Sequence, residues 1–440
     1  MPTSISAKEY KHENELLKQE IERKTGKSTE QLYEEREKRV RDAIELKTPD
    51  RIPLTTEIKI SSYTGVPNSA AYYDPIAFKR AIRKITLDFE PDMCNAGLPT
   101  SGDALTTLDV KNRMWPGGPL PTDYDYQFVE CEFMKEDEYD LFLTNPSDFM
   151  IRRFFPRMYG ALAPLEKLPP LDGLFLGFEM MTPMFTTPEF VKLAKNLYKA
   201  GREMARFRKA VGDGYEDLAQ LGFPAFAHVG TGGVGGAPFD TVSSFLRGMQ
   251  GAMTDMFRRP EKLLQACDMI LERRIAAARP ADPKQRGNPK RTGIPLWRGD
   301  KVFMSDKQFE RFYWPGLKKS LQAHIDLNYV PVPFFEAKFG DRLKHLLELP
   351  KGKVLASVEH MDAIKAREIL NGHTCIMIRG PHSSKIWSVR EVEQYTRELI
   401  DRCRKAGKSG GLIIAMRMPD RGTREEYRQM LDRIREYGRY

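Results

Sequence analysis

Short apolar runs alternate with capped helical segments in the second half of the chain, and this alternation limits the available folds more than any other feature. The apolar runs are residues 332–335, 354–358, 374–378 and 412–416. Between them, Asp362 precedes a helical segment that ends before Gly372. Ser388 and Glu391 form a capping box for a helix that reaches Ala406. Repeats of this kind predict a parallel sheet with crossover helices.

The same alternation extends upstream, so the chain from residue 48 onward predicts an α/β fold. Pro188 and Pro260 open helices, and Ser305 caps another. Such repeats form either a doubly wound sheet or a (β/α)8 barrel. About eight units are present, which favours a (β/α)8 TIM barrel with long inserted loops. The expected strands lie near residues 52–58, 92–96, 174–179, 225–229, 294–297, 332–336, 354–359, 374–379 and 412–417.

The N-terminal segment differs from the rest of the chain. Residues 8–46 are dense in charge and favour helix, with a break at Gly26. We therefore expect two amphipathic helices that pack on the main body or on a second subunit of a homodimer. A turn at Thr48-Pro49-Asp50 leads into the first apolar strand. The predicted division is a helical extension over residues 1–47 and a barrel over residues 48–440.

Composition excludes several classes of protein. The five cysteines of the 440 residues are scattered and never form a C-x-x-C pair, so we expect a reducing, cytoplasmic compartment and no disulfide framework. No apolar run approaches the roughly 18 residues of a membrane helix, so we expect a soluble protein. The net charge of +9 comes largely from residues 279–319 and 401–440. Those segments lack nucleic-acid-binding motifs, and a solvated surface, an anionic ligand or an acidic protein partner explains them better.

A glycine-rich segment, Gly230-Thr-Gly232-Gly233-Val-Gly235-Gly236, follows an expected strand and formally matches the dinucleotide fingerprint. Pro238 interrupts the helix that should follow, and the segment lies in the middle of the chain. An active-site loop, in which Gly232 and Gly233 approach a ligand, and a structural turn both remain open.

Polar residues at the ends of the expected strands are the candidates for chemistry, because barrel enzymes place their active sites there. The candidates are Glu336, Glu359, His360, Arg379, His382, Arg417 and His228. The carboxylate of Glu336 comes directly after two phenylalanines, so it could act as a metal ligand, an acid or a base. A salt bridge would also explain its position. Glu336, His360 and His382 could bind zinc with an open fourth position. A separate group that includes Phe178 and Met180 predicts either core packing or an apolar pocket for a flat ligand.

The order of these motifs resembles that of the uroporphyrinogen decarboxylase superfamily of (β/α)8 barrels. The segments that carry the resemblance include PDRIPL, GGAPFDTVSSFLRGMQGAMTDMFRRPEKLL, WRGDKVFMSDKQFERFYWPGLKKSL, VPFFEAKFGDRLKHLLELPKGKV, ASVEHMD and CIMIRGPHS. The decarboxylases themselves carry an Arg-Gln-Ala-Gly-Arg motif where this chain has TTEIKISSYTGVP. Asp103 is the nearest match to their pyrrole-binding aspartate. The missing arginine motif disfavours decarboxylation of a porphyrinogen.

The corrinoid-dependent methyltransferases form another branch of this superfamily, and the chain resembles them more. Members that methylate a thiol hold zinc with His-x-Cys, where this chain has Glu336-Ala-Lys338, and with a further Cys, where it has Met416-Arg417. A thiol acceptor is therefore disfavoured. The resemblance implies transfer of a methyl group from a small methylated substrate, such as a methoxyaromatic or polycyclic compound, to a corrinoid (cobalamin) that is free or held by a partner protein.

The resemblance also assigns roles within this site. Glu336, His360 and His382 would bind zinc or act as the acid, while Arg379 and Arg417 would hold the leaving group or the corrinoid. Asp103 would contact the substrate by the same resemblance, and from their positions in the sequence we expect His228, Phe178 and Met180 to contact the substrate or cofactor as well. Two alternatives remain: a decarboxylase or lyase acting on a carboxylated substrate at the same strand ends, and a non-catalytic tetrapyrrole-binding protein.

Overall fold

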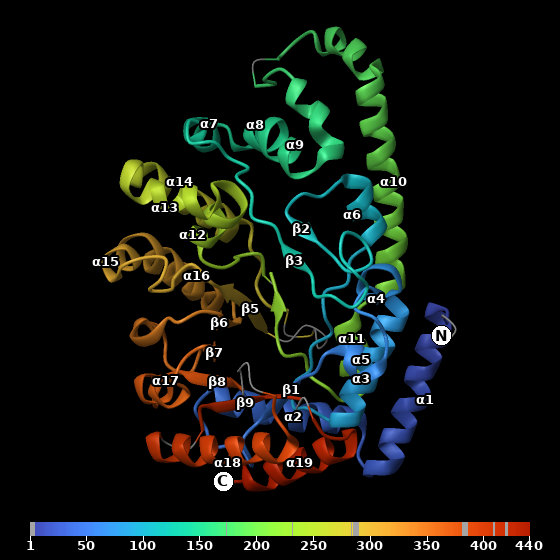
Figure 1. The fold of residues 1–440 in the computed structure, drawn as a ribbon, viewed down its shortest axis with the longest axis vertical. Helices are drawn as coiled ribbons and strands as arrows, with labels where there is room; N and C mark the ends of the chain where they lie inside the picture. Colours follow the sequence, from blue (N-terminus) through green and yellow to red (C-terminus); the bar gives the residue numbers. More distant parts are fainter. Residues whose placement is uncertain are drawn as a thin grey trace.

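A parallel sheet of seven strands lies at the centre of the computed structural model (Figure 1). The structure describes residues 5–172, 174–230, 232–282, 284, 290–380, 386–407, 410–418 and 421–440. In spatial order the strands are β1 (Leu54–Glu57), β9 (Leu412–Arg417), β8 (Cys375–Gly380), β7 (Leu355–Val358), β6 (Val330–Phe335), β5 (Arg291–Leu296) and β4 (His228–Val229). The sheet is curled, so its two edge strands, β1 and β4, approach each other.

A seam of single bridges lies between those edge strands. Thr55 pairs with Met93 and Cys94 pairs with Ala225, both in parallel. The expected strand near residues 92–96 is therefore reduced to two bridged residues, because no ladder forms on either side of it. The barrel prediction is confirmed in part: the α/β architecture and the curled parallel sheet are present, but the paired strands span only part of a barrel.

Helices cover the outer face of the sheet, as the sequence pattern predicts. Ser305 and Ser388 cap their helices through the expected capping boxes. The largest apolar core lies between these helices and the outward-facing side chains of the strands, such as Leu54, Ile376 and Ile414. The covering helices are α12 (Pro238–Thr241), α13 (Gly248–Arg258), α14 (Pro260–Ala277), α15 (Asp306–Gln308), α16 (Trp314–Asp326), α17 (Ala363–Leu370), α18 (Val389–Ala406) and α19 (Arg424–Tyr437).

A second core fills the inside of the curled sheet. It contains inward-facing residues of several strands, including Val332, Leu355 and Met377, and it is covered at the amino-terminal ends of the strands by Val40 and Ile44 of α2 (Thr29–Ile44). The two expected N-terminal helices are thus present as α1 (Ala7–Thr25) and α2, separated at Gly26. Whether residues 1–47 form a separate domain stays a prediction.

Short helices and long loops extend from the other end of the sheet, together with the long helix α10 (Pro188–Val211) (Figure 1). The α-helices of this region are α3 (Ile60–Thr64), α4 (Ala70–Tyr73), α6 (Gly102–Leu108), α7 (Tyr139–Thr144), α8 (Pro146–Phe149), α9 (Phe155–Met158) and α11 (Gly214–Ala219). Helix α5 (Pro75–Phe89) belongs to the outer face, because its Ile85 and Phe89 share the largest core with Leu54. A small antiparallel pair is formed by β2 (Arg113–Met114) and β3 (Gln127–Phe128).

Turns of other helical types interrupt the α-helices. The 3₁₀ helices are Gly160–Lys167, Phe178–Thr186 and Gly340–Glu348, and the π-helical turns are Met150–Phe154, Val242–Leu246 and Phe309–Tyr313. The strand expected near residues 174–179 is wrong. Its apolar residues find no neighbouring strand in the described part of the chain, and Phe175 and Leu176 remain 89% and 91% exposed. A search of the described residues for a helix long and apolar enough to cross a bilayer finds none.

Candidate active site

Five charged residues at the carboxyl ends of neighbouring strands form one layer, which we call the charged layer. In spatial order they are Glu57, Arg417, Arg379, Glu359 and Glu336. Glu57 lies opposite Arg417 in the pairing of β1 with β9. Val358 lies opposite both Phe335 and Ile378, so the residues that follow these three are also neighbours. Because side chains alternate between the two faces of a strand, all five belong to the face that lines the inside of the sheet.

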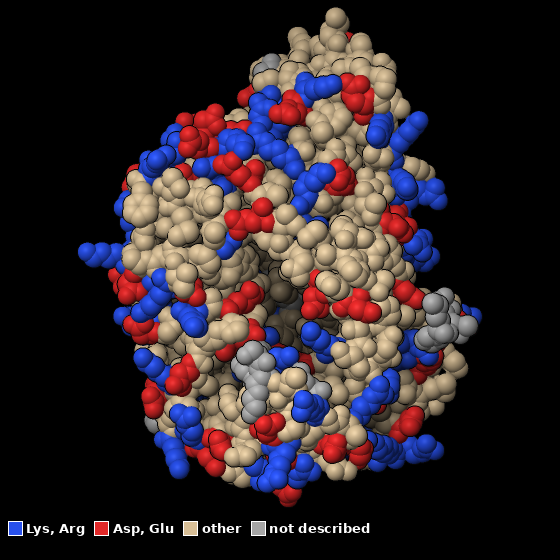
Figure 2. Space-filling model, viewed as in Figure 1, with Lys and Arg blue, Asp and Glu red and all other residues tan. Residues whose placement is uncertain are grey.

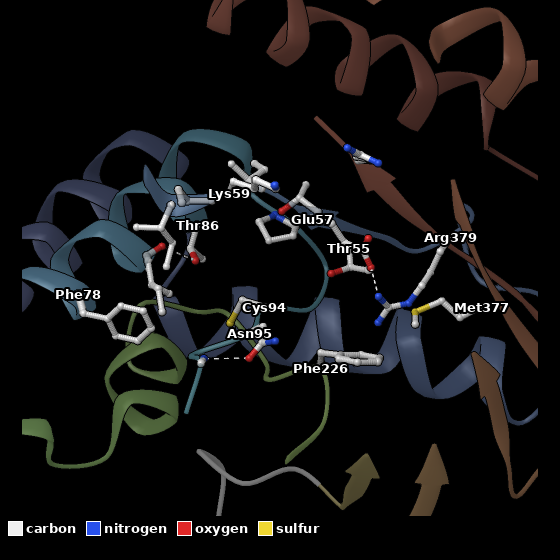
Figure 3. Close-up of a pocket in the computed structure, with 18 of the residues that line it drawn as sticks. Thr55, Glu57, Lys59, Phe78, Thr86, Cys94, Asn95, Phe226, Met377 and Arg379 are labelled. Atoms are coloured by element: carbon white, nitrogen blue, oxygen red, sulfur yellow. Dashed lines mark hydrogen bonds and ion pairs between the residues drawn. The ribbon is translucent and has the colours of Figure 1, made fainter. Parts of the chain in front are cut away.

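An ion pair joins two members of the charged layer across β9. Arg379 Nη1 lies 2.6 Å from Glu57 Oε1 (Figure 3). Arg379 Nε donates a hydrogen bond of 3.2 Å to Ser357 Oγ. The guanidinium also lies 4.1 Å from the centre of the Phe334 ring. Burial raises the pKa of Glu57 above its ordinary value, and the charges of Arg379 and Arg417 only partly oppose this effect. Three contacts therefore hold Arg379 in one orientation.

Glu336 is the member of the layer best suited to donate a proton. Its side chain is half-buried, and no hydrogen bond to its carboxylate is formed by the residues that the structure describes. Burial raises the pKa of Glu336, the neighbouring charge of Glu359 raises it further, and Arg379 opposes the shift. A carboxyl group in this environment keeps its proton to a higher pH than a free glutamic acid does.

A cavity of about 620 Å³ opens beside the charged layer. Its lining includes Glu57, Glu359, Arg379 and Arg417 at one end and apolar side chains of α5 at the other (Figure 3). Glu336 belongs to the charged layer but does not line the cavity itself. This volume lies within the range of roughly 300–1,000 Å³ for small-molecule sites. On the surface, a hollow with both acidic and basic side chains at its rim lies near the middle of the face seen in Figure 2.

The sequence did not single out Glu57, and it named Glu359 as a candidate without giving it a role. Glu57 lies in the polar run TTEIK, where nothing marks a strand end, and only its pairing with β9 brings it to the charged layer. Glu359 lines the cavity, whereas the adjacent His360 is exposed and does not. The alternation of Leu355, Ser357 and Glu359 along one face could have favoured Glu359 over His360.

The remaining predicted residues lie elsewhere or outside the described part of the chain. Gly232 and Gly233 adopt positive φ angles, and an added Cβ at Gly232 would lie 2.6 Å from the Tyr329 ring, which precedes β6. Neither glycine lines the cavity, so the structural turn fits this segment. Asp103 is exposed in the first turn of α6. The cavity lining does not include it either.

Phe178 and Met180 do not line this cavity, and they are 57% and 79% exposed. His228 belongs to β4, but its side chain is outside what the structure describes, and so is all of His382. The binding roles of these residues stay predictions.

The described residues offer an incomplete set of metal ligands. Within them, no group of three His, Cys, Asp or Glu side chains is placed to hold a metal ion. The predicted zinc ligands Glu336 and His360 belong to the described part, but the third ligand, His382, does not. The zinc site therefore stays a prediction.

Comparison with known proteins supports the architecture. No protein-family model matches the chain, and no curated protein does. Among solved structures, a methyltransferase from Methanosarcina mazei is similar to this chain, with a TM-score of 0.51 and 14% sequence identity. The match covers 90% of this chain and 97% of that protein. At this identity the similarity concerns the fold, over nearly the whole length of both chains.

Proposed function

We propose that the protein is a methyltransferase that removes a methyl group from the oxygen of a small methylated substrate and passes it to a corrinoid. The observation that carries the proposal is the charged layer, in which Glu336, whose pKa is raised by burial, and the oriented Arg379 lie on either side of Glu359. The likeness of the fold to a methyltransferase supports it. We also propose that residues 93–94 act as the second strand of a complete eight-stranded barrel.

The chemistry requires an acid near the substrate oxygen. When the methyl group leaves, the oxygen keeps the electron pair of the broken C–O bond and becomes an anion. Glu336 donates its proton to this oxygen, and burial, which raises its pKa, favours the protonated form more than in a free glutamic acid. Positive charge on Arg379 and Arg417 stabilises the negative charge as it develops.

A corrinoid supplies the nucleophile that accepts the methyl group. A whole corrinoid is larger than the drug-sized ligands that cavities of 620 Å³ hold, so a free or protein-bound corrinoid would approach the mouth from outside. The described residues supply only two of the three predicted zinc ligands, and no step proposed here passes through a metal.

One observation favours methyl transfer over the decarboxylase alternative. A decarboxylase would use Arg379 to hold a substrate carboxylate, but Glu57 already occupies that guanidinium with a contact of 2.6 Å. A substrate carboxylate would bring a further negative charge beside the partly buried Glu57 and would share Arg379 with it. A neutral ether substrate brings no such charge.

An anaerobic absorbance assay tests the proposal. Cob(I)alamin is mixed with the purified chain and a set of methoxylated aromatic compounds, and we expect the spectrum of the methylated corrinoid to appear only when both protein and substrate are present. Glu336→Gln removes the proton donor and is expected to lower the rate by about 10²–10⁴-fold. The matched control is Glu310→Gln, an exposed carboxylate on the outer helices, which should leave the rate unchanged.

Three results would contradict the proposal. Equal rates in the unmutated chain and the Glu336→Gln variant would remove Glu336 from the reaction. Release of carbon dioxide without a corrinoid would favour the decarboxylase. Binding of cobalamin without turnover of any methylated compound would favour a non-catalytic binding protein.

A further inference from the structure

We propose that the end of the cavity beside α5 is a subsite for an uncharged, apolar part of the substrate, either an aromatic ring or an alkyl chain. This inference rests on the proposed function only for the direction in which the substrate lies. We call this end of the cavity the α5 subsite and define it by Phe78, Ile82, Ile85, Thr86 and Cys94.

The α5 subsite has an apolar wall built from one face of one helix. Phe78, Ile82 and Ile85 are spaced at i, i+4 and i+7, which places them on the same side of α5. All three are buried, yet all three line the cavity. In Figure 3 Phe78 lies on the far side of Cys94 and Asn95 from Arg379, so the apolar wall and the charged layer are at opposite ends.

Three polar groups along this part of the cavity already have hydrogen-bond partners within the protein. Thr86 Oγ1 donates to the Ile82 carbonyl at 2.9 Å, and Cys94 Sγ donates to the Pro224 carbonyl at 3.4 Å. Thr55 Oγ1, at the seam, donates to the Met93 carbonyl at 2.8 Å. A polar part of a ligand placed here would lose its hydrogen bonds to water and gain few in return. An apolar part loses none.

The seam of the sheet explains why the cavity reaches α5 at all. In a fully paired barrel, side chains on the inner and outer faces of a strand are separated by the continuous ladder. Here β1 and residues 93–94 share one bridge, and the cavity lining includes Glu57 from the inner face as well as helix residues from the outer face. A single ligand can therefore extend from the charged layer to the α5 subsite.

These observations assign an amphipathic substrate with two ends. The reacting oxygen lies at the charged layer, and an aromatic or alkyl body extends over the seam onto α5. Sugars and other highly hydroxylated compounds are excluded from this class, because their hydroxyl groups would find too few partners beside Phe78 and Ile82.

A series of 4-alkylphenols, from 4-methylphenol to 4-hexylphenol, tests the subsite by isothermal titration calorimetry on the full chain. The phenol is the product expected from a methyl aryl ether, and the alkyl tail reports on the α5 end. We expect the dissociation constant to fall by about fourfold for each added methylene until the subsite is full. A dissociation constant that does not change with tail length would overturn the inference.

Three variants test whether the dependence of affinity on tail length arises in the α5 subsite. Ile82→Trp fills the subsite, so the gain in affinity should stop at a shorter tail, whereas Ile85→Ala enlarges it and should extend the gain to a longer one. Leu87→Trp is the matched control, because Leu87 belongs to the same helix but not to the cavity lining. Circular dichroism shows whether Ile82→Trp folds. If it does not, the extension of the affinity gain to longer tails in Ile85→Ala still tests the inference. An identical series in Ile85→Ala and the unmutated chain would contradict the inference.

The calorimetric series does not depend on turnover or on a corrinoid. Affinity that rises with tail length in a chain that fails to transfer methyl groups would support the subsite and overturn only the proposed function. Methyl transfer with no dependence of binding on tail length would support the proposed function and overturn the subsite.

Discussion

Asp92 joins the N-terminal helices to the start of the sheet, and its replacement by asparagine gives a stringent test of the fold. The carboxylate is 1% exposed and accepts hydrogen bonds from Arg39 Nη1 at 2.7 Å, from Arg51 Nη1 and Nη2 at 2.6 and 2.8 Å, and from the Leu54 backbone N–H at 2.8 Å. Arg39 belongs to α2 and Leu54 opens β1, so one side chain connects both.

The expected cost follows from the charges that Asp92→Asn leaves behind. Removing one partner of a buried ion pair costs about 3–5 kcal/mol of unfolding free energy. Arg39 keeps an ion pair with Asp50 at 2.7 Å, and the side chains of Arg39 and Arg51 are 13% and 15% exposed. We therefore expect Asp92→Asn to lower the unfolding free energy by an amount near the lower end of this range, about 3 kcal/mol.

Urea unfolding followed by tryptophan fluorescence measures this loss, since urea does not screen charges as guanidinium does. Burial alone would raise the pKa of Asp92, but Arg51 and Arg39 outweigh it and lower the pKa below the ordinary 3.8. The carboxylate therefore stabilises the fold above that pH and loses its contribution as the pH falls through the lower folded-state pKa. The difference in unfolding free energy between Asp92→Asn and the unmutated chain should stay constant from pH 7 to pH 5.

Asp432→Asn is the control for this measurement. Asp432 forms an ion pair of 2.5 Å with Arg435, but its side chain is 62% exposed, so its loss should cost less than about 1 kcal/mol. A loss from Asp92→Asn as small as that of the control would refute the reasoning and would mean that α2 is not held to the sheet as described.

Other perturbations test the site and its surroundings. Arg379→Met removes a positive charge beside Glu57 and should lower the rate of methyl transfer roughly a hundredfold, measured as an initial rate. Burial raises the pKa of Asp240 to about 7. The protonated side chain therefore stabilises the fold fully below pH 4, and this contribution falls as the pH rises to 7. In Asp240→Asn the urea midpoint should no longer decline over this pH range. Gly97→Ala places a Cβ 2.6 Å from the Phe78 ring at a φ of +69°, so it should destabilise the fold by more than about 1 kcal/mol and weaken binding of the alkylphenols.

Features that depend on neighbouring residues in the sequence were predicted well. The capping boxes at Ser305 and Ser388 and the helix start at Pro260 are present as expected, because each cap acts within three or four residues of the chain. The buried strands β6 to β9 were also found, since uninterrupted apolar runs of that length are typical of parallel strands. These elements are enough to indicate the α/β class.

Features that depend on pairing between distant segments were predicted poorly. Residues 174–179 have the composition of a strand but no partner strand, so they form a bend and the start of a 3₁₀ helix. Glu57 joins the charged layer only through β9, which lies more than 350 residues away in the sequence. At the end of β7 the sequence favoured His360, but the alternation of side chains directs the preceding Glu359 into the cavity.

The destination of the methyl carbon tests the central claim most directly. A methoxyaromatic substrate carrying ¹³C in its methyl group is incubated anaerobically with cob(I)alamin and the unmutated chain, and the label is followed by ¹³C NMR. We expect the label to move from the methoxy resonance to the resonance of a cobalt-bound methyl group as the free phenol appears. A label that stays on the substrate for every compound in the set, while a carboxylated analogue loses carbon dioxide, would contradict it.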